Sequence, residues 1–210
     1  LHDIGLLLRA QQRPAEAEAV FVRAGRLIAE LPDDRGSLAS SNAFLVAMSL
    51  QDQGDHEGAE PHFRRSLELR RQQHGERHAL VAQAMANLGT CLFKQGRKSQ
   101  AADLQDEALT MQREMGLQGM SLLTSVGNVA FLLDDAGRLE EAEPYHREYL
   151  ELAAEVFGEH TPQSINGRAR FFDNLRRREL WLEAGGHARQ VAAWRHANLL
   201  PNPGLIDTLT

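Results

Sequence analysis

An internal repeat of about 42 residues constrains the fold of this chain more than any other feature of its sequence. The segment AEPHFRRSLEL at 59–69 matches AEPYHREYLEL at 142–152 in register at seven positions. One alanine recurs in each repeat, shortly after residues that break a helix. These alanines, spaced 41 or 42 residues apart, are Ala17, Ala59, Ala101, Ala142 and Ala184.

Within each repeat, apolar residues recur every three or four positions, which is the spacing of one helix face. Val81, Met85 and Leu88 form such a stripe, and Gly96 follows it at a position suited to the left-handed turn that ends a helix. Alternating runs of β-branched residues, which would indicate strands, do not occur. The sequence therefore predicts helix-turn-helix hairpins.

The recurring alanine predicts one packing geometry repeated along the chain, because a small side chain lets two helices approach closely. A single hairpin cannot bury its own apolar face, so neighbouring hairpins must stack into a solenoid with a concave and a convex side. We expect an all-α domain over 1–203 and a C-terminal tail over 204–210. The expected repeats are 1–36, 37–78, 79–119, 120–161 and 162–203, of which the last is the least regular.

Two motifs and two loops carry a resemblance to a known family. NLGTCLFKQGRKSQA at 87–101 and NVAFLLDDAGRLEEAEPYHR at 128–147, with the loops at 74–78 and 157–162, resemble the 42-residue tetratricopeptide repeats of kinesin light chains. The resemblance covers essentially the whole chain and implies a right-handed superhelix. Its inner groove, lined by the first helix of each repeat, would hold an extended or helical peptide. Because the sequence begins inside a helical pattern, we expect a piece of a longer protein. Many bacterial repeat proteins use the same repeat variant, so the resemblance implies a bacterial protein.

The same resemblance assigns candidate residues to the peptide groove. In the family, asparagines at the sites of Asn87 and Asn128 often bond the peptide backbone, a task that suits an amide because it both donates and accepts. Asn128 and Arg170 also match part of a clamp for a terminal carboxylate, but Ala86 and Thr90 stand where that clamp has lysine and asparagine. The groove candidates are Phe44, Met48, Gln83, Asn87, Thr90, Phe93, Lys94, Thr124, Asn128, Phe131, Asn166 and Arg170.

Each kind of candidate also has an interpretation that involves only the fold. The two asparagines can face solvent or bond a neighbouring helix. The apolar candidates can belong to the core between repeats, as most apolar residues at helical spacing do. The arginine run at 176–178 is either a cluster that recognises carboxylates or phosphates, or the surface of an end cap.

The chain lacks the residue patterns of known catalytic and metal sites. Cys91 has apolar neighbours and no base in its motif, so we interpret it as a packing thiol. His74 and His78 lack the spacing of zinc ligands. Asp134 and Asp135 are adjacent on a helix and point apart, so we interpret them as solvated charges. Without a phosphate-binding loop, a dinucleotide motif or a nucleophile elbow, we expect no enzyme, cofactor or metal.

Charge and composition narrow the class of partner. The formal net charge of -6 disfavours nucleic acid, whose binding needs a basic face. No stretch approaches the roughly 20 apolar residues of a membrane span. The single cysteine fits a reducing compartment. We therefore expect a cytoplasmic protein that binds a protein or peptide.

The sequence favours a binding scaffold that performs no chemistry. One alternative is a regulatory or substrate-recruiting domain of a larger signalling enzyme, such as a bacterial Ser/Thr kinase. A second alternative is a peptide-pheromone sensor, in which a short peptide closes the superhelix.

Overall fold

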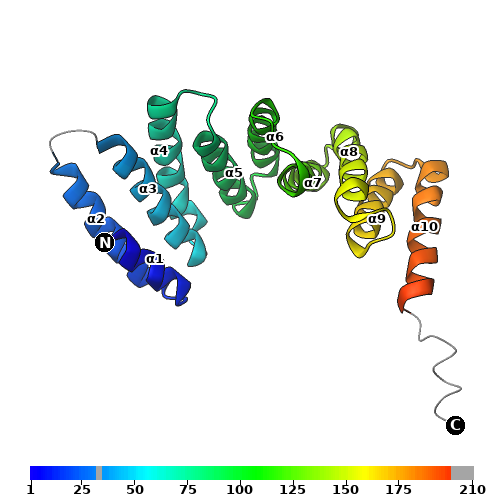
Figure 1. Cartoon of the computed structure of the whole chain (residues 1–210), viewed down its shortest axis with the longest axis horizontal. Coiled ribbons are helices and arrows are strands. Elements are labelled where there is room, and N and C mark those ends of the chain that lie inside the picture. Colours follow the sequence, from blue (N-terminus) through cyan, green and yellow to red (C-terminus); the bar gives the residue numbers. More distant parts are fainter. Residues whose placement is uncertain (32–34, 200–210) are drawn as a thin grey trace, which may run out of the picture. The chain divides into compact units, whose positions relative to one another are not determined.

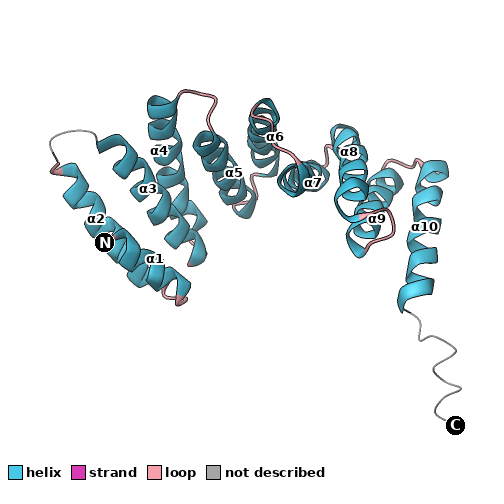
Figure 2. Ribbon diagram, viewed as in Figure 1, coloured by secondary structure: helices cyan, strands magenta, loops and turns pink. Residues whose placement is uncertain are grey.

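A computed structural model of the chain describes residues 1–31 and 35–199, and all the regular structure in this part is α-helical (Figures 1 and 2). The expected tail at 204–210 lies outside the described residues. The all-α prediction is confirmed. The ten helices of the described part are α1 (His2–Ala10), α2 (Pro14–Ala29), α3 (Arg35–Asp52), α4 (His56–His74), α5 (Ala79–Lys94), α6 (Lys98–Glu114), α7 (Gly119–Asp135), α8 (Leu139–Phe157), α9 (Pro162–Arg177) and α10 (Trp181–Leu199).

The helices follow one another in pairs joined by short turns, so each pair is one hairpin. Two of the expected repeat boundaries fall inside helices. Helix α3 begins at Arg35 and helix α7 at Gly119, one or two residues before the boundaries placed at 36/37 and 119/120. Helix ends are the least certain feature of any sequence pattern.

The chain divides into two compact blocks after the third hairpin. The N-terminal block, residues 1–117, contains α1 to α6. The C-terminal block begins at Gln118 and contains α7 to α10. Each block is described here by itself.

The turn inside each hairpin requires a residue with a positive φ. Gly54, Gly96 and Gly137 occupy this position in the middle hairpins, with φ of 82°, 81° and 78°. In the first and last hairpins Gln12 and Glu179 take the same conformation, with φ of 59° and 61°. Glycine is the default residue here because it lacks a Cβ, so these two turns form at a local energetic cost.

The recurring alanines lie at the centre of the helix packing, as the sequence predicts. Four of them are fully buried and Ala184 is 1 % exposed. Phe21 and Phe63, one turn further along α2 and α4, are also fully buried. Small and large side chains thus alternate along the buried stripe of the second helices, which lets neighbouring helices interlock.

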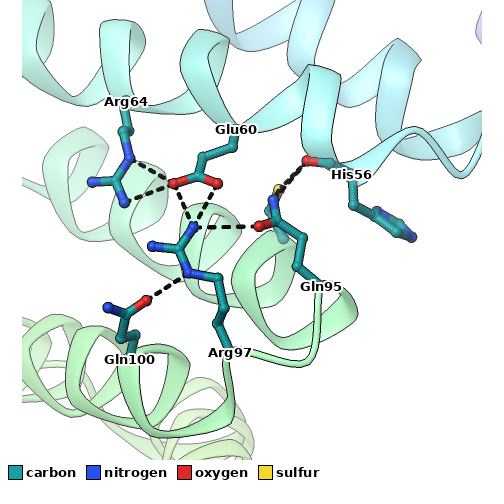
Figure 3. A network of polar contacts seen from close by, with 7 residues as sticks. His56, Glu60, Arg64, Gln95, Arg97 and Gln100 are labelled. Carbon is teal, nitrogen blue, oxygen red and sulfur yellow. Dashed lines mark hydrogen bonds and ion pairs between the residues drawn. The ribbon is translucent and has the colours of Figure 1, made fainter.

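A polar link joins the second hairpin to the third (Figure 3). Arg97, in the turn before α6, donates through Nη1 to both oxygens of Glu60 on α4, at 2.8 and 2.7 Å. Arg64 donates to the same carboxylate at 2.8 Å. Burial opposes the charged form of Glu60, but hydrogen bonds from Arg64 and Arg97 outweigh it and lower the pKa of this carboxyl.

The acceptor glutamate of this link recurs at equivalent positions in two other repeats, where the donor comes from the residue before the positive-φ turn residue. Gln53 donates to Glu18 Oε2 at 2.8 Å between the first two hairpins. In the C-terminal block, Arg178 donates to Glu143, and this bond lowers the pKa of the Glu143 carboxyl together with a bond from Arg147. In three repeats, a glutamate one residue after the recurring alanine therefore holds the turn of the next hairpin; after Ala101 the residue is Ala102.

Candidate functional site

The first helices present a repeated face of four positions at spacings i, i+4, i+7 and i+11. This spacing keeps the positions on one side of a helix. The side chains on this first-helix face are exposed or half-buried. They are Gln83, Asn87, Thr90 and Lys94 on α5, Thr124, Asn128, Phe131 and Asp135 on α7, and Asn166, Arg170, Asp173 and Arg177 on α9.

In the C-terminal block, the first-helix face contains a pocket of about 280 Å³ between α7 and α9. Phe131, 43 % exposed, supplies its largest apolar surface. Arg170 comes to the same pocket from α9, so two of the predicted binding residues meet there. The full lining consists of Phe131, Asp134, Asp135, Arg170, Asp173 and Arg177.

The floor of this pocket is fixed by hydrogen bonds to Asp134. Its Oδ2 lies 2.7 Å from Nε2 of the buried His146, and its Oδ1 accepts from Asn174 Nδ2 at 2.7 Å. Its backbone carbonyl accepts from Arg177 at 3.0 Å. The interpretation of Asp134 as a solvated charge is wrong, because this carboxylate ties α7 to α8 and α9.

The arginine run at 176–178 does not form one cluster. Arg176 pairs with Asp173 on its own helix at 2.6 Å. Arg177 lines the pocket, whereas Arg178 turns to Glu143 on α8. Consecutive helical residues point about 100° apart, so only Arg177 is placed to meet a ligand in the pocket.

In the N-terminal block, two predicted binding residues instead hold the packing of three helices. The buried Arg70 of α4 donates to Leu80 O at 2.8 Å and to Gln83 Oε1 at 3.1 Å, and its guanidinium lies 4.6 Å from the ring centre of Phe44. Burial lowers the pKa of Arg70. Phe44 also packs edge-on against Phe63, with ring centres 5.8 Å apart. Gln83 therefore supports the interface between the second and third hairpins, and Phe44 supports the packing of α3 against α4 within the second.

Three polar candidates bond the preceding turn of their own helix. Asn87 Nδ2 donates to Gln83 O at 2.8 Å, Thr90 Oγ1 to Ala86 O at 3.1 Å, and Thr124 Oγ1 to Met120 O at 2.9 Å. Such bonds fix the side chains against the helix. Of the remaining candidates, Met48 and Phe93 are half-buried, and Lys94, Asn128 and Asn166 are exposed.

The interpretation of Cys91 as a packing thiol is confirmed by its complete burial. Its thiol donates to His56 O at 3.1 Å. Gln95 donates to the same carbonyl at 2.8 Å (Figure 3). Burial raises the pKa of the Cys91 thiol, which disfavours the reactive thiolate.

The two histidines of the loop at 74–78 pack against each other, and His78 caps the start of α5. His78 Nδ1 accepts from Leu80 N at 3.2 Å at the start of α5, and its ring stacks on His74 with centres 4.2 Å apart. Within residues 1–31 and 35–199, no three His, Cys, Asp or Glu side chains gather as metal ligands would. None of the described helices is long and apolar enough to cross a membrane.

His187 on α10 makes the stability of the C-terminal block depend on pH. Burial lowers its pKa from 6.5, and the charges of Arg168 and Arg147 add to this, whereas Glu183 opposes them. From about pH 6.5 down to the lowered pKa of the folded state, the unfolded chain binds more protons than the folded chain. Stability is therefore expected to fall as the pH drops through this range.

The test is urea unfolding followed by tryptophan fluorescence, with the unfolding midpoint measured at pH values above and below 6.5. The midpoint should drop more on acidification in the wild-type chain than in His187→Gln, which cannot titrate. Equal drops in the two chains would contradict a role for His187.

Comparisons with known proteins place the chain in a family. Two family models, both described as tetratricopeptide repeat, match residues 38–114 and 122–163 and together cover more than half of the chain. The chain belongs to the tetratricopeptide-repeat family. Its fold is generally a non-catalytic scaffold for protein interaction. A comparison with curated protein sequences gives no significant match.

Solved structures share the fold at low sequence identity. A protein of Podospora anserina described as a kinesin light chain, with nearly identical repeats, is 14 % identical with a TM-score of 0.78, covering 92 % of each chain. BtubC (BKLC) from P. vanneervenii is 19 % identical with a TM-score of 0.74, covering 95 % of this chain and 80 % of that one. MamA from Desulfovibrio magneticus RS-1 is 15 % identical with a TM-score of 0.66, covering 93 % of each. The fold is thus of the kinesin-light-chain-like repeat type.

Proposed function

We propose that the C-terminal block binds a peptide segment of a partner protein on its part of the first-helix face, with the pocket between α7 and α9 as an anchor site. The main support for this site is the composition of that pocket. It combines an exposed aromatic ring, Phe131, with the guanidinium of Arg170 above a floor fixed by Asp134. Buried aromatic and arginine contacts supply most of the energy of protein interfaces.

The size and chemistry of the pocket suit side chains of a peptide. Its volume of about 280 Å³ lies below the roughly 300–1,000 Å³ of cofactor and small-molecule sites. An apolar side chain of the ligand would contact Phe131, and a carboxylate would bond Arg170 or Arg177 bidentately. Asp135 and Asp173 would accept from backbone N–H groups or from a lysine of the ligand.

On the N-terminal block, the residues that remain candidates for contact with a peptide are Asn87, Thr90 and Lys94 of α5 and Met48 of α3. Phe44 and Gln83 contribute only by holding the helices that carry these residues, because Arg70 engages both of them. Asn128 and Asn166 flank the α7–α9 pocket on the first-helix face and would bond the main chain of the peptide.

The test starts from peptides selected on the full chain from a random display library. Their affinities are then measured for wild type and for Phe131→Ala, Arg170→Ala and Asn128→Ala. Loss of an anchor or of a bonded polar partner costs about 1–3 kcal/mol, or roughly 5- to 150-fold in Kd. Leu182→Ala is the matched control, since Leu182 is 97 % exposed on α10 and outside the pocket.

We expect the Phe131 and Arg170 variants to weaken peptide binding while the control does not. A set of peptides that binds all four variants as tightly as wild type, with unchanged circular dichroism, would exclude this pocket as the anchor.

A further inference from the structure

A second hollow lies in the N-terminal block, between the second helices α2 and α4. It has a volume of about 620 Å³ and a mostly apolar wall. Val22 and Ile28 come from α2, Leu69 from α4, and Ala43 and Val46 form the floor on α3. Val22 is 36 % exposed, so apolar surface on the wall faces solvent. We call this hollow the outer groove.

Three residues at the outer groove are smaller than their counterparts one repeat later. Gly25, Ala39 and Ala43 stand where the next repeat has Leu67, Val81 and Met85. The larger residues are buried, Leu67 at 7 % exposure and the other two fully. The hollow beside α4 one repeat later is lined mainly by charged and polar side chains, among them Arg64, Glu68 and Arg71, so it lacks the apolar wall of the outer groove.

The outer groove is separate from the first-helix face. On α3, the positions equivalent to Gln83 and Asn87 of the first-helix face are Ser41 and Leu45. The lining residues Ala39 and Ala43 precede them by two residues. Two residues turn an α-helix by about 200°, so the two sets lie on opposite sides of α3. A ligand in the outer groove would leave the first-helix face available.

The charges around the outer groove have one sign. Arg26 on α2 and Arg65 on α4 line it, beside the polar ring of His62, and none of the described residues in the lining is a carboxylate. Arg65 also pairs with Glu68 at 2.8 Å, but both side chains are more than half exposed, which makes this pair weak and easily exchanged. An apolar hollow with a cationic rim is complementary to an apolar side chain beside a carboxylate.

We propose that the outer groove docks an acidic amphipathic segment of a partner protein, with a bulky apolar side chain over Ala43 and a carboxylate at Arg26 or Arg65. The site is independent of the α7–α9 pocket. It would let one chain hold two different protein segments at once.

The variants for the test follow from the repeat. Ala43→Met inserts the residue of the next repeat and fills the outer groove. Gly25→Leu is less suitable, because a Cβ there would lie 2.7 Å from Asn42 Nδ2. Arg26→Glu and Arg65→Glu reverse the rim charge at exposed positions that do not disturb the core. Phe131→Ala is the control at the other site.

Peptides are selected from a random display library on the wild-type chain after depletion on Ala43→Met. We expect them to carry an aromatic or large aliphatic residue next to Asp or Glu. Their Kd should rise at least about 10-fold in each rim variant, the loss of one charge-assisted bond. It should stay unchanged in Phe131→Ala. Peptides of basic or random composition, or equal binding to the rim variants, would overturn the proposal.

Two further measurements exclude other occupants. Amide chemical shifts are recorded with 4-phenylbutanoate and, as the matched cation, 4-phenylbutan-1-amine. Shifts at Gly25 and Ala43 with the carboxylate alone support the chemistry of the site, whereas equal shifts with the amine contradict it. If 4-phenylbutanoate binds but the display selection yields no peptide, the ligand of the groove would be a small carboxylate. Self-association that Ala43→Met abolishes would indicate a second copy. Either result would overturn the proposal that a segment of a partner protein occupies the outer groove.

Discussion

Replacing Phe63 by Ala is expected to lower the free energy of unfolding of the N-terminal block by about 3–5 kcal/mol, the range for a buried aromatic truncated in a core. Phe63 is fully buried on α4 and packs edge-on against Phe44 of α3. The cavity would lie under Arg70, whose guanidinium covers the same Phe44 ring. The measurement is urea unfolding followed by circular dichroism at 222 nm.

Two variants calibrate this result. Phe63→Leu keeps an apolar side chain and should cost less than Phe63→Ala. Phe131→Ala removes the same ring from an exposed position and should cost little stability. If Phe63→Ala were no more destabilising than Phe131→Ala, the packing of α3 against α4 described above would be incorrect.

Replacing Phe171 by Ala is expected to destabilise the C-terminal block by a similar amount, about 3–5 kcal/mol. Phe171 is 1 % exposed and stacks on His146, with ring centres 5.4 Å apart. The ring of His187 lies at 4.9 Å and the guanidinium of Arg147 at 5.1 Å from the Phe171 centre. The variant loses these contacts in addition to buried area.

The two tryptophans of the chain, Trp181 and Trp194, both lie on α10, so tryptophan fluorescence reports on the block that contains Phe171. Its urea midpoint is the measurement. The neighbouring Phe172 is half-buried and gives a matched control, Phe172→Ala, with a smaller expected loss. If Phe171→Ala and Phe172→Ala lowered the free energy of unfolding equally, the Phe171 ring would not be a main contact of this core.

Most of the fold could be predicted from the sequence because its determinants are local. The 3.6-residue periodicity and the turn glycines lie within one hairpin, and the recurring alanines mark the packing between hairpins. Gln12 and Glu179 show the limit of this reasoning, since they take the left-handed conformation without being glycine. Their neighbours in the hairpin impose a conformation that their own residue type disfavours.

For the candidate site, the sequence predicts which side of the first helices carries the residues but not the role of each residue. Helical spacing places Gln83 and Thr124 at equivalent positions of that face, but their roles depend on the second helices. Gln83 bonds Arg70, and the residues equivalent to Arg70 in the next two repeats are Gln112 and Ala153. Asp134 meets His146 and Asn174, which are 12 and 40 residues away. Partners at such separations leave no mark in a local pattern.

The burial of Cys91 makes the chain suited to site-specific labelling. A maleimide reacts with a thiolate, and the only thiol of the chain is enclosed and has a raised pKa. Cysteines introduced at exposed positions, such as Leu182 or Lys94, would therefore react first without removal of the native residue. A donor dye at one position and an acceptor at the other would report in solution on the distance between the two blocks, with and without a bound peptide.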